Sequence, residues 1–128
     1  MPLLADTPAD RAEQMLALTE RLTLLLDAET QLLQARQPPL AGAEGEEKAR
    51  LANLYRQEMA RIAENKSLIA GAPKPLTEKL KAATTRFRTA LKTHETALIG
   101  VKTITEGLVK AIAEEVRAAR AGPAGYGA

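Results

Sequence analysis

The sequence predicts an all-α fold, an antiparallel three-helix, coiled-coil-like bundle with a long C-terminal helix that overhangs the other two. Apolar residues recur at helical spacing along most of the 128 residues, and proline and glycine cluster at only two internal breaks. Residues 76–120 contain no proline. Aromatic residues make up 2% of the chain, so the core must use the aliphatic side chains that form helix seams.

The first helix is expected over residues 8–37. Thr7 can cap it, Pro8 suits the first helical position, and Asp10 places an acid in the first turn. Glu29 interrupts the apolar seam, and we expect it to set the register by pairing with a cation from the next helix; a contact with a client protein is the alternative. The seam comprises Met15, Leu18, Leu22, Leu25, Leu26, Leu32 and Leu33.

The second helix is expected over residues 45–70, with acidic residues at its start. Its apolar stripe is thin and is interrupted by Glu58, so it should depend on tertiary contacts. Gly71, followed by Pro73 and Pro75, is a strong signal for its end. The stripe comprises Leu51, Leu54, Tyr55, Met59, Ile62 and Ile69.

The third helix, over residues 75–120, is too long for its neighbours. It would reach about 65 Å, against about 40 to 45 Å for the first two helices. The start of the second helix should lie level with Gly100, so residues 101–120 should have no opposing helix. An uncovered apolar face usually marks a partner site. The client-binding residues predicted on this basis are Val101, Ile104, Leu108, Val109, Ile112 and Val116; burial of the same face in a homodimer is the alternative.

Two other features of the third helix have both structural and functional interpretations. His94 projects into the apolar stripe, where we expect a hydrogen-bonded histidine at the edge of the core rather than a catalytic base or ligand. Small residues that include Gly100 and Gly107 form a strip on the opposite side. This strip could allow another helix to approach closely or let this helix bend, or it could consist of tolerated surface residues.

The chain is expected to form one helical domain over residues 1–120, followed by a flexible Gly/Pro/Ala tail over residues 121–128. Residues 1–47 contain nine acidic and three basic residues, and residues 48–128 contain seven acidic and fifteen basic residues. The two halves should therefore attract each other within the bundle. The basic residues of the third helix flank the apolar stripe without interleaved aromatics, so no nucleic-acid partner is expected.

No catalytic, cofactor-binding or metal-binding constellation emerges, so we do not expect an enzyme and assign no cofactor. A mutase-like helical enzyme would need several converging charged side chains, and Glu29, Glu58 and Lys66 are too few. The absence of cysteine excludes disulfides and thiolate metal sites. Without a signal sequence or a sustained apolar run, the chain is expected to be cytoplasmic and not to insert stably into a membrane.

Several segments of the chain together resemble a known protein family. The leucine- and glutamate-rich run over residues 18–33, the charged run over residues 47–51, the long third helix and the closing Gly125-Tyr126-Gly127 are similar to the FlgN-type flagellar export chaperones, including their alphaproteobacterial FlbY-like branch. The resemblance implies a cytoplasmic helical chaperone that holds hook-associated (hook-filament junction) proteins before type III export. A structural coiled-coil homo-oligomer, or an adaptor unrelated to export, is the alternative.

Overall fold

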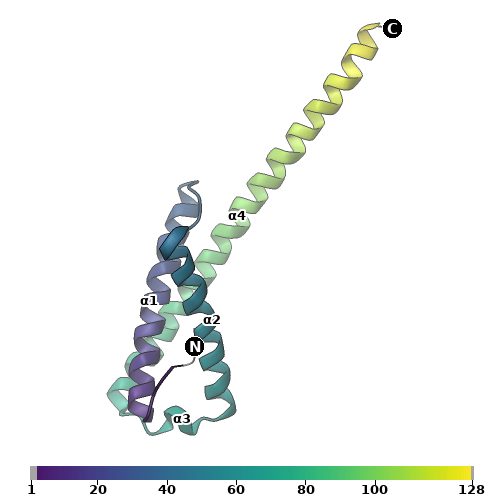
Figure 1. The fold of residues 1–128 in the computed structure, drawn as a ribbon. Coiled ribbons are helices and arrows are strands. Elements are labelled where there is room, and N and C mark those ends of the chain that lie inside the picture. The colour runs from purple at the N-terminus through teal and green to yellow at the C-terminus, as the bar shows by residue number, and fades with distance from the viewer. Residues whose placement is uncertain (1–2, 128) are drawn as a thin grey trace.

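The computed structural model describes the backbone of residues 3–127 and the side chains of residues 3–120. Four helices make up this part of the chain: α1 (Pro8–Gln34), α2 (Gly42–Glu64), α3 (Ser67–Ala70) and α4 (Lys74–Gly127). α1 and α2 run in opposite directions, α3 turns the chain at the base, and α4 runs parallel to α1 and far beyond it (Figure 1). The described residues contain no strand, which confirms the predicted all-α fold with a long C-terminal helix.

The core lies where α1 packs against the first half of α4, with α2 on one side. Leu22 and Leu26 of α1 meet Phe87 and Ala90 of α4 in its central cluster. Tyr55 of α2 completes this cluster by packing its ring on that of Phe87, with 4.6 Å between the ring centroids. The apolar side chains of α2 are at most half-buried, as expected from its thin stripe.

The ends of α1 follow from local side-chain chemistry. The hydroxyl of Thr7 accepts a 3.0 Å hydrogen bond from the amide of Asp10, which confirms the predicted cap. At the other end, α1 stops at Gln34 rather than at the predicted residue 37. Arg36 adopts a left-handed conformation with φ of 62°, and the amide of Gln37 then donates to the carbonyl of Leu32 at 2.8 Å. This reversal ends the helix before the two prolines do.

The prediction of one helix over residues 45–70 is wrong at its C-terminal end, because α2 ends at Glu64 and α3 is a separate single turn. Asn65 is extended, with φ of −138° and ψ of 88°, and its side-chain oxygen accepts a hydrogen bond from the amide of Ser67 at 3.2 Å. Asparagine side chains compete with helical backbone bonds in this way, which accounts for the break.

Beyond the bundle, α4 continues as a single helix without a neighbour, as Figure 1 shows. The prediction that the bundle ends near Gly100 is confirmed, but the neighbour at that level is the tip of α1, whose Leu33 and Gln34 lie across a hollow from Gly100 and Val101. We call residues 101–120 the overhang.

The helix itself extends to Gly127, past the predicted end at residue 120. The predicted flexible tail over residues 121–128 falls beyond the described side chains and stays a prediction. Within the described part of the chain, no helix combines the length and apolar character needed to cross a membrane.

Candidate functional site

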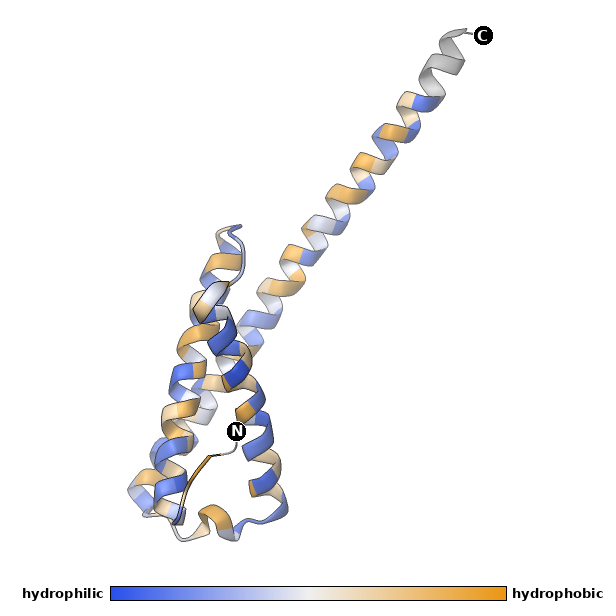
Figure 2. Cartoon of the chain, in the orientation of Figure 1, coloured by the Kyte–Doolittle hydropathy of each residue, from blue (hydrophilic) through white to orange (hydrophobic). Residues whose placement is uncertain are grey.

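The overhang carries a continuous apolar face with nothing packed on it. All residues from 102 to 120 are exposed, and Val101 is half-buried at the edge of the bundle. Figure 2 shows apolar positions recurring along this part of α4. Two further large apolar side chains, Leu98 and Ile99, are also exposed, although they were not among the predicted client-binding residues. The predicted residues that are exposed are Ile104, Leu108, Val109, Ile112 and Val116.

This exposed face continues the seam by which α4 packs in the bundle. Residues seven apart lie on nearly the same side of an α-helix, so Val101 and Leu108 extend the line that begins below with Phe87. Phe87 is 5% exposed because α1 and α2 cover it. Leu108 is 59% exposed because α1 has already ended at Gln34. The same line of residues is therefore core at Phe87 and solvent-exposed at Leu108, while Leu91 and Leu98 at its flank are exposed already within the bundle.

A hollow of about 280 Å³ lies at the junction between the tip of α1 and the overhang. Its walls combine apolar and small side chains with one cation, Arg36. The left-handed backbone of Arg36 costs a non-glycine residue free energy, and such strained positions cluster at functional sites. No pattern in the sequence indicated this conformation, because arginine rarely adopts it. The residues that line the hollow, which we call the junction hollow, are Leu33, Gln34, Arg36, Thr93, Thr96, Ala97, Gly100, Val101 and Ile104.

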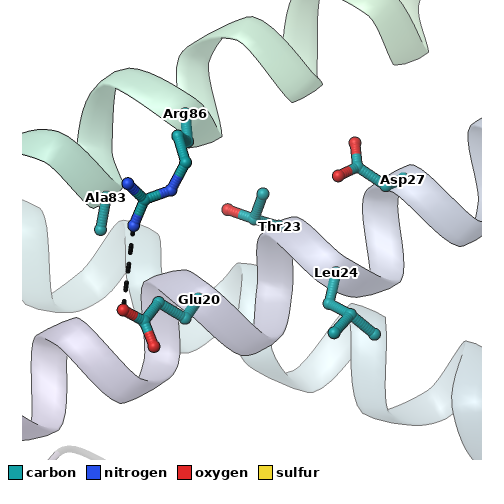
Figure 3. A pocket seen from close by; sticks show the side chains of 6 residues that line it. All are labelled: Glu20, Thr23, Leu24, Asp27, Ala83 and Arg86. Carbon is teal, nitrogen blue, oxygen red and sulfur yellow. Dashed lines mark ion pairs between the residues drawn. The ribbon is translucent and has the colours of Figure 1, made fainter.

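A second hollow, of about 340 Å³, lies lower down between α1 and α4 (Figure 3). Glu20 and Asp27 of α1 and Arg86 of α4 line it, and Arg86 lies 3.9 Å from the carboxylate of Glu20. Both members of this pair are more than half exposed, so its contribution to stability is small. The pair matches the predicted attraction between the acidic first half of the chain and the basic second half.

Glu29 joins three segments at a buried position. Its side chain is 4% exposed, and its Oε1 accepts hydrogen bonds from Lys48 Nζ at 2.5 Å and from His94 Nε2 at 2.6 Å. Its Oε2 accepts from the amide of Leu40 at 3.1 Å. The predicted pairing of Glu29 with a cation from the next helix is thus confirmed, and His94 is the predicted hydrogen-bonded histidine rather than an isolated base.

The surroundings of Glu29 favour its charged form. Burial acts to raise the pKa of its carboxyl, but the hydrogen bonds from Lys48 and His94, with the charge of Lys48, outweigh burial and hold the pKa below its ordinary value of 4.5. A carboxyl whose folded-state pKa is depressed stabilises the fold above its unfolded pKa. That stabilisation is lost as the pH falls through the folded value.

We expect the Glu29→Gln variant to be less stable than the wild type at neutral pH by about 1 to 2 kcal/mol, because hydrogen bonds to a charged group are replaced by weaker ones. The difference should shrink as the pH falls from the ordinary carboxyl pKa of 4.5 through the lower pKa that Glu29 has in the folded chain. Urea unfolding at a series of pH values measures it. Glu78→Gln is the control, since both members of the pair of Glu78 with Lys81 are solvent-exposed and this pair should matter little. A difference that persists unchanged in acid would contradict this assignment.

A buried ion pair lies near the base of the bundle. Glu58 of α2 has no exposed surface, and its Oε2 accepts a 2.8 Å hydrogen bond from Arg11 of α1. Its Oε1 accepts from Arg61 at 3.0 Å and from the amide of Leu3 at 2.9 Å, which ties the N-terminal segment to the bundle. These partners serve packing between segments and leave the carboxylate no access to a substrate. The sequence showed Glu58 interrupting a stripe but did not identify Arg11 as its partner.

The strip of small residues on α4 is exposed, and its middle part lines the junction hollow opposite the tip of α1. The hydroxyls of Thr85, Thr89, Thr93 and Thr96 each donate to the carbonyl four residues earlier in α4. A methyl group added at Gly100 or Gly107 would meet nothing within 4 Å. These residues therefore add no buried side chain to the core.

Comparison with known proteins gives a relative that spans the whole chain. The flagellar basal-body protein FlbY of Caulobacter vibrioides is 40% identical to this chain over 129 aligned positions, which cover 100% of this chain and 87% of the relative. No protein-family model matches the chain, and no solved structure matches it. Identity at this level over the full chain shows common descent, so the protein belongs to the FlbY family of flagellar basal-body proteins.

Proposed function

We propose that this flagellar protein is a non-enzymatic, cytoplasmic export chaperone of the FlgN type. In this role it would bind an amphipathic helix of hook-associated junction proteins and keep them soluble and competent for type III export. The observation that carries the proposal is the overhang, a helix whose apolar face is core within the bundle and uncovered beyond it. The flagellar assignment of the family supports the choice of clients.

The geometry suits recognition of a helix. The exposed side chains recur at spacings of three, four and seven residues, which is the pattern on which an amphipathic helix packs. Burying large aliphatic side chains supplies about 1.5 to 3 kcal/mol each, so a few of them suffice for a stable complex. A client helix held in this way would also be kept from associating with other copies of itself.

We expect the chain to co-purify with a hook-associated junction protein when the two are expressed together. Size-exclusion chromatography with light scattering should give the mass of a complex that contains both proteins. Capture of the tagged chain from the flagellated host, followed by mass spectrometry, should recover the same client. A chain that forms a dimer through the overhang and retains no junction protein in either experiment would instead support the structural coiled-coil homo-oligomer.

A further inference from the structure

We propose that the overhang binds its partner helix in one orientation, antiparallel to α4, with Arg36 at the negative, C-terminal end of the partner helix and Glu115 at its positive, N-terminal end. This inference rests on the proposed function. It adds the orientation of the partner helix relative to α4 and the two residues that determine this orientation. It assigns to Arg36 and Glu115 a role in specificity.

The junction hollow fixes one end of the docking site. A helix that lies over Val101 and Ile104 meets the tip of α1 there, because Leu33 and Gln34 line the same hollow. Arg36 lines the hollow at this point and is exposed. Among the side chains of residues 3–120, no carboxylate forms an ion pair with it. Its charge is therefore free to interact with the end of a helix that is bound on the overhang.

The carbonyl groups at the end of α1 do not neutralise Arg36. The carbonyls of Gln31, Leu32 and Leu33 accept hydrogen bonds from the amides that follow α1, at 2.8 to 3.1 Å. The turn that makes these bonds needs the left-handed backbone of Arg36, with φ of 62°. Glycine would serve this turn better, so the arginine side chain is retained at a conformational cost. A cation at this position favours the C-terminal end of a helix, which carries a partial negative charge.

Glu115 marks the other end of the site. It lies two helical turns beyond Leu108, so it projects within the apolar face rather than on the polar side of α4. It is exposed, and no cation among residues 3–120 pairs with it. A carboxylate there favours the N-terminal end of a helix, where the partial charge is positive.

The two charges are separated by a helix-sized interval. Gly100, at the level of the junction hollow, and Glu115 are 15 residues apart, or about 22 Å at the rise of an α-helix. A partner helix of about 15 residues, or four turns, spans this interval. In the antiparallel orientation both of its ends face an opposite charge, and in the parallel orientation both face a like charge.

Because the chain lacks cysteine, disulfide trapping with introduced cysteines can determine the orientation of the partner helix on the overhang. The probe is the full-length hook-associated junction protein of the same bacterium, with one cysteine at either the N-terminal or the C-terminal end of its amphipathic helix. The full chain carries Gln37→Cys, beside Arg36, or Ala119→Cys, five turns beyond Val101 on the same face. Gln37→Cys should trap the C-terminal label and Ala119→Cys the N-terminal label.

The outcomes distinguish the proposed orientation of the partner helix from the proposed export-chaperone function. The reverse trapping pattern, or equal trapping of both labels at both positions, would overturn the assigned orientation while leaving the export chaperone intact. Failure of the wild-type chain to bind the junction protein would overturn the proposed function and this inference together.

Substitutions test the two charges. Arg36→Gly keeps the left-handed turn and removes only the charge, so it should weaken binding about two- to fivefold at low salt without unfolding the bundle. Arg36→Lys should retain most of the affinity. Glu115→Gln should weaken binding by a similar factor, and the loss should diminish at high salt. Unchanged affinity in both Arg36→Gly and Glu115→Gln would exclude a role for these charges.

Discussion

A chain carrying Ile104→Asp and Leu108→Asp should lose its partner while its bundle unfolds at an unchanged temperature. Ile104 is 47% exposed and Leu108 is 59% exposed, and neither belongs to the core of the bundle. Exposed substitutions usually change stability by no more than about 0.5 kcal/mol. Each side chain should contribute about 1.5 to 3 kcal/mol when a partner covers it, so the double variant should lose at least about a hundredfold in affinity.

Two controls test whether the loss of binding is specific to the apolar face and independent of the stability of the bundle. Thr103→Asp with Lys110→Asp places two carboxylates on the opposite, exposed face of the same helix segment and should leave binding nearly intact. Leu22→Ala should do the reverse of the overhang variant: Leu22 is 1% exposed, and its truncation should cost about 2 to 5 kcal/mol of stability. Thermal unfolding and titration calorimetry measure the two quantities. Unfolding of the Ile104/Leu108 variant as a dilute monomer would show that the overhang is core.

The second large effect should come from the buried pair of Arg11 and Glu58. Replacing Arg11 with methionine leaves the Glu58 carboxylate in a site with no exposed surface and removes its 2.8 Å partner from α1. Breaking a buried ion pair from one side typically costs about 3 to 5 kcal/mol, and we expect the lower end of this range because Arg61 still pairs with Glu58 at 3.0 Å. A chain of this size has a total stability of about 5 to 15 kcal/mol, so the loss should be evident in urea unfolding.

The double variant Arg11→Met with Glu58→Leu should recover much of this loss, because it removes the buried carboxylate that lost its partner from α1. Arg61, which also pairs with Glu58, is 44% exposed and stays hydrated. The four chains form a double-mutant cycle that isolates the coupling between the two side chains. Glu58→Leu also removes the acceptor for the amide of Leu3, so protection of that amide from hydrogen exchange should fall. A double variant no more stable than Arg11→Met alone would contradict this expectation. It would show that the stability is lost through the packing of the Arg11 side chain and not through the Glu58 carboxylate.

Features that depend on one helix at a time could be predicted from the sequence. Residues close together in the chain set the Thr7 cap, the long helix without proline over residues 76–120 and the apolar face of the overhang. The pairing of Glu29 with a cation of the next helix was also predictable, because a single charge in an apolar seam needs a partner.

The partner of Glu58 and two local reversals of the backbone were missed. The partner of Glu58 is 47 residues away in the chain, and a helical projection of α2 cannot locate it. The break at Asn65 depends on a side-chain bond that competes with the helix, and the left-handed turn at Arg36 opposes the preference of its residue type. The junction hollow lies where α1 ends at this turn, with Leu33, Gln34 and Arg36 on one side and Gly100 on the other.

The attachment of the overhang to the bundle has a consequence for how a client is captured. Starting an isolated helix in water is costly, because several residues must be fixed before the first hydrogen bond forms. In α4 the bundle has already nucleated the helix, and each residue of the overhang only extends it. Gly100 and Gly107 weaken that continuation, and no tertiary contact compensates for them. Helical order is then best supported next to the bundle and least at the far end. A client helix should accordingly make its first contacts next to the junction hollow and its later contacts progressively toward the distal end. Dissociation should begin at the distal end.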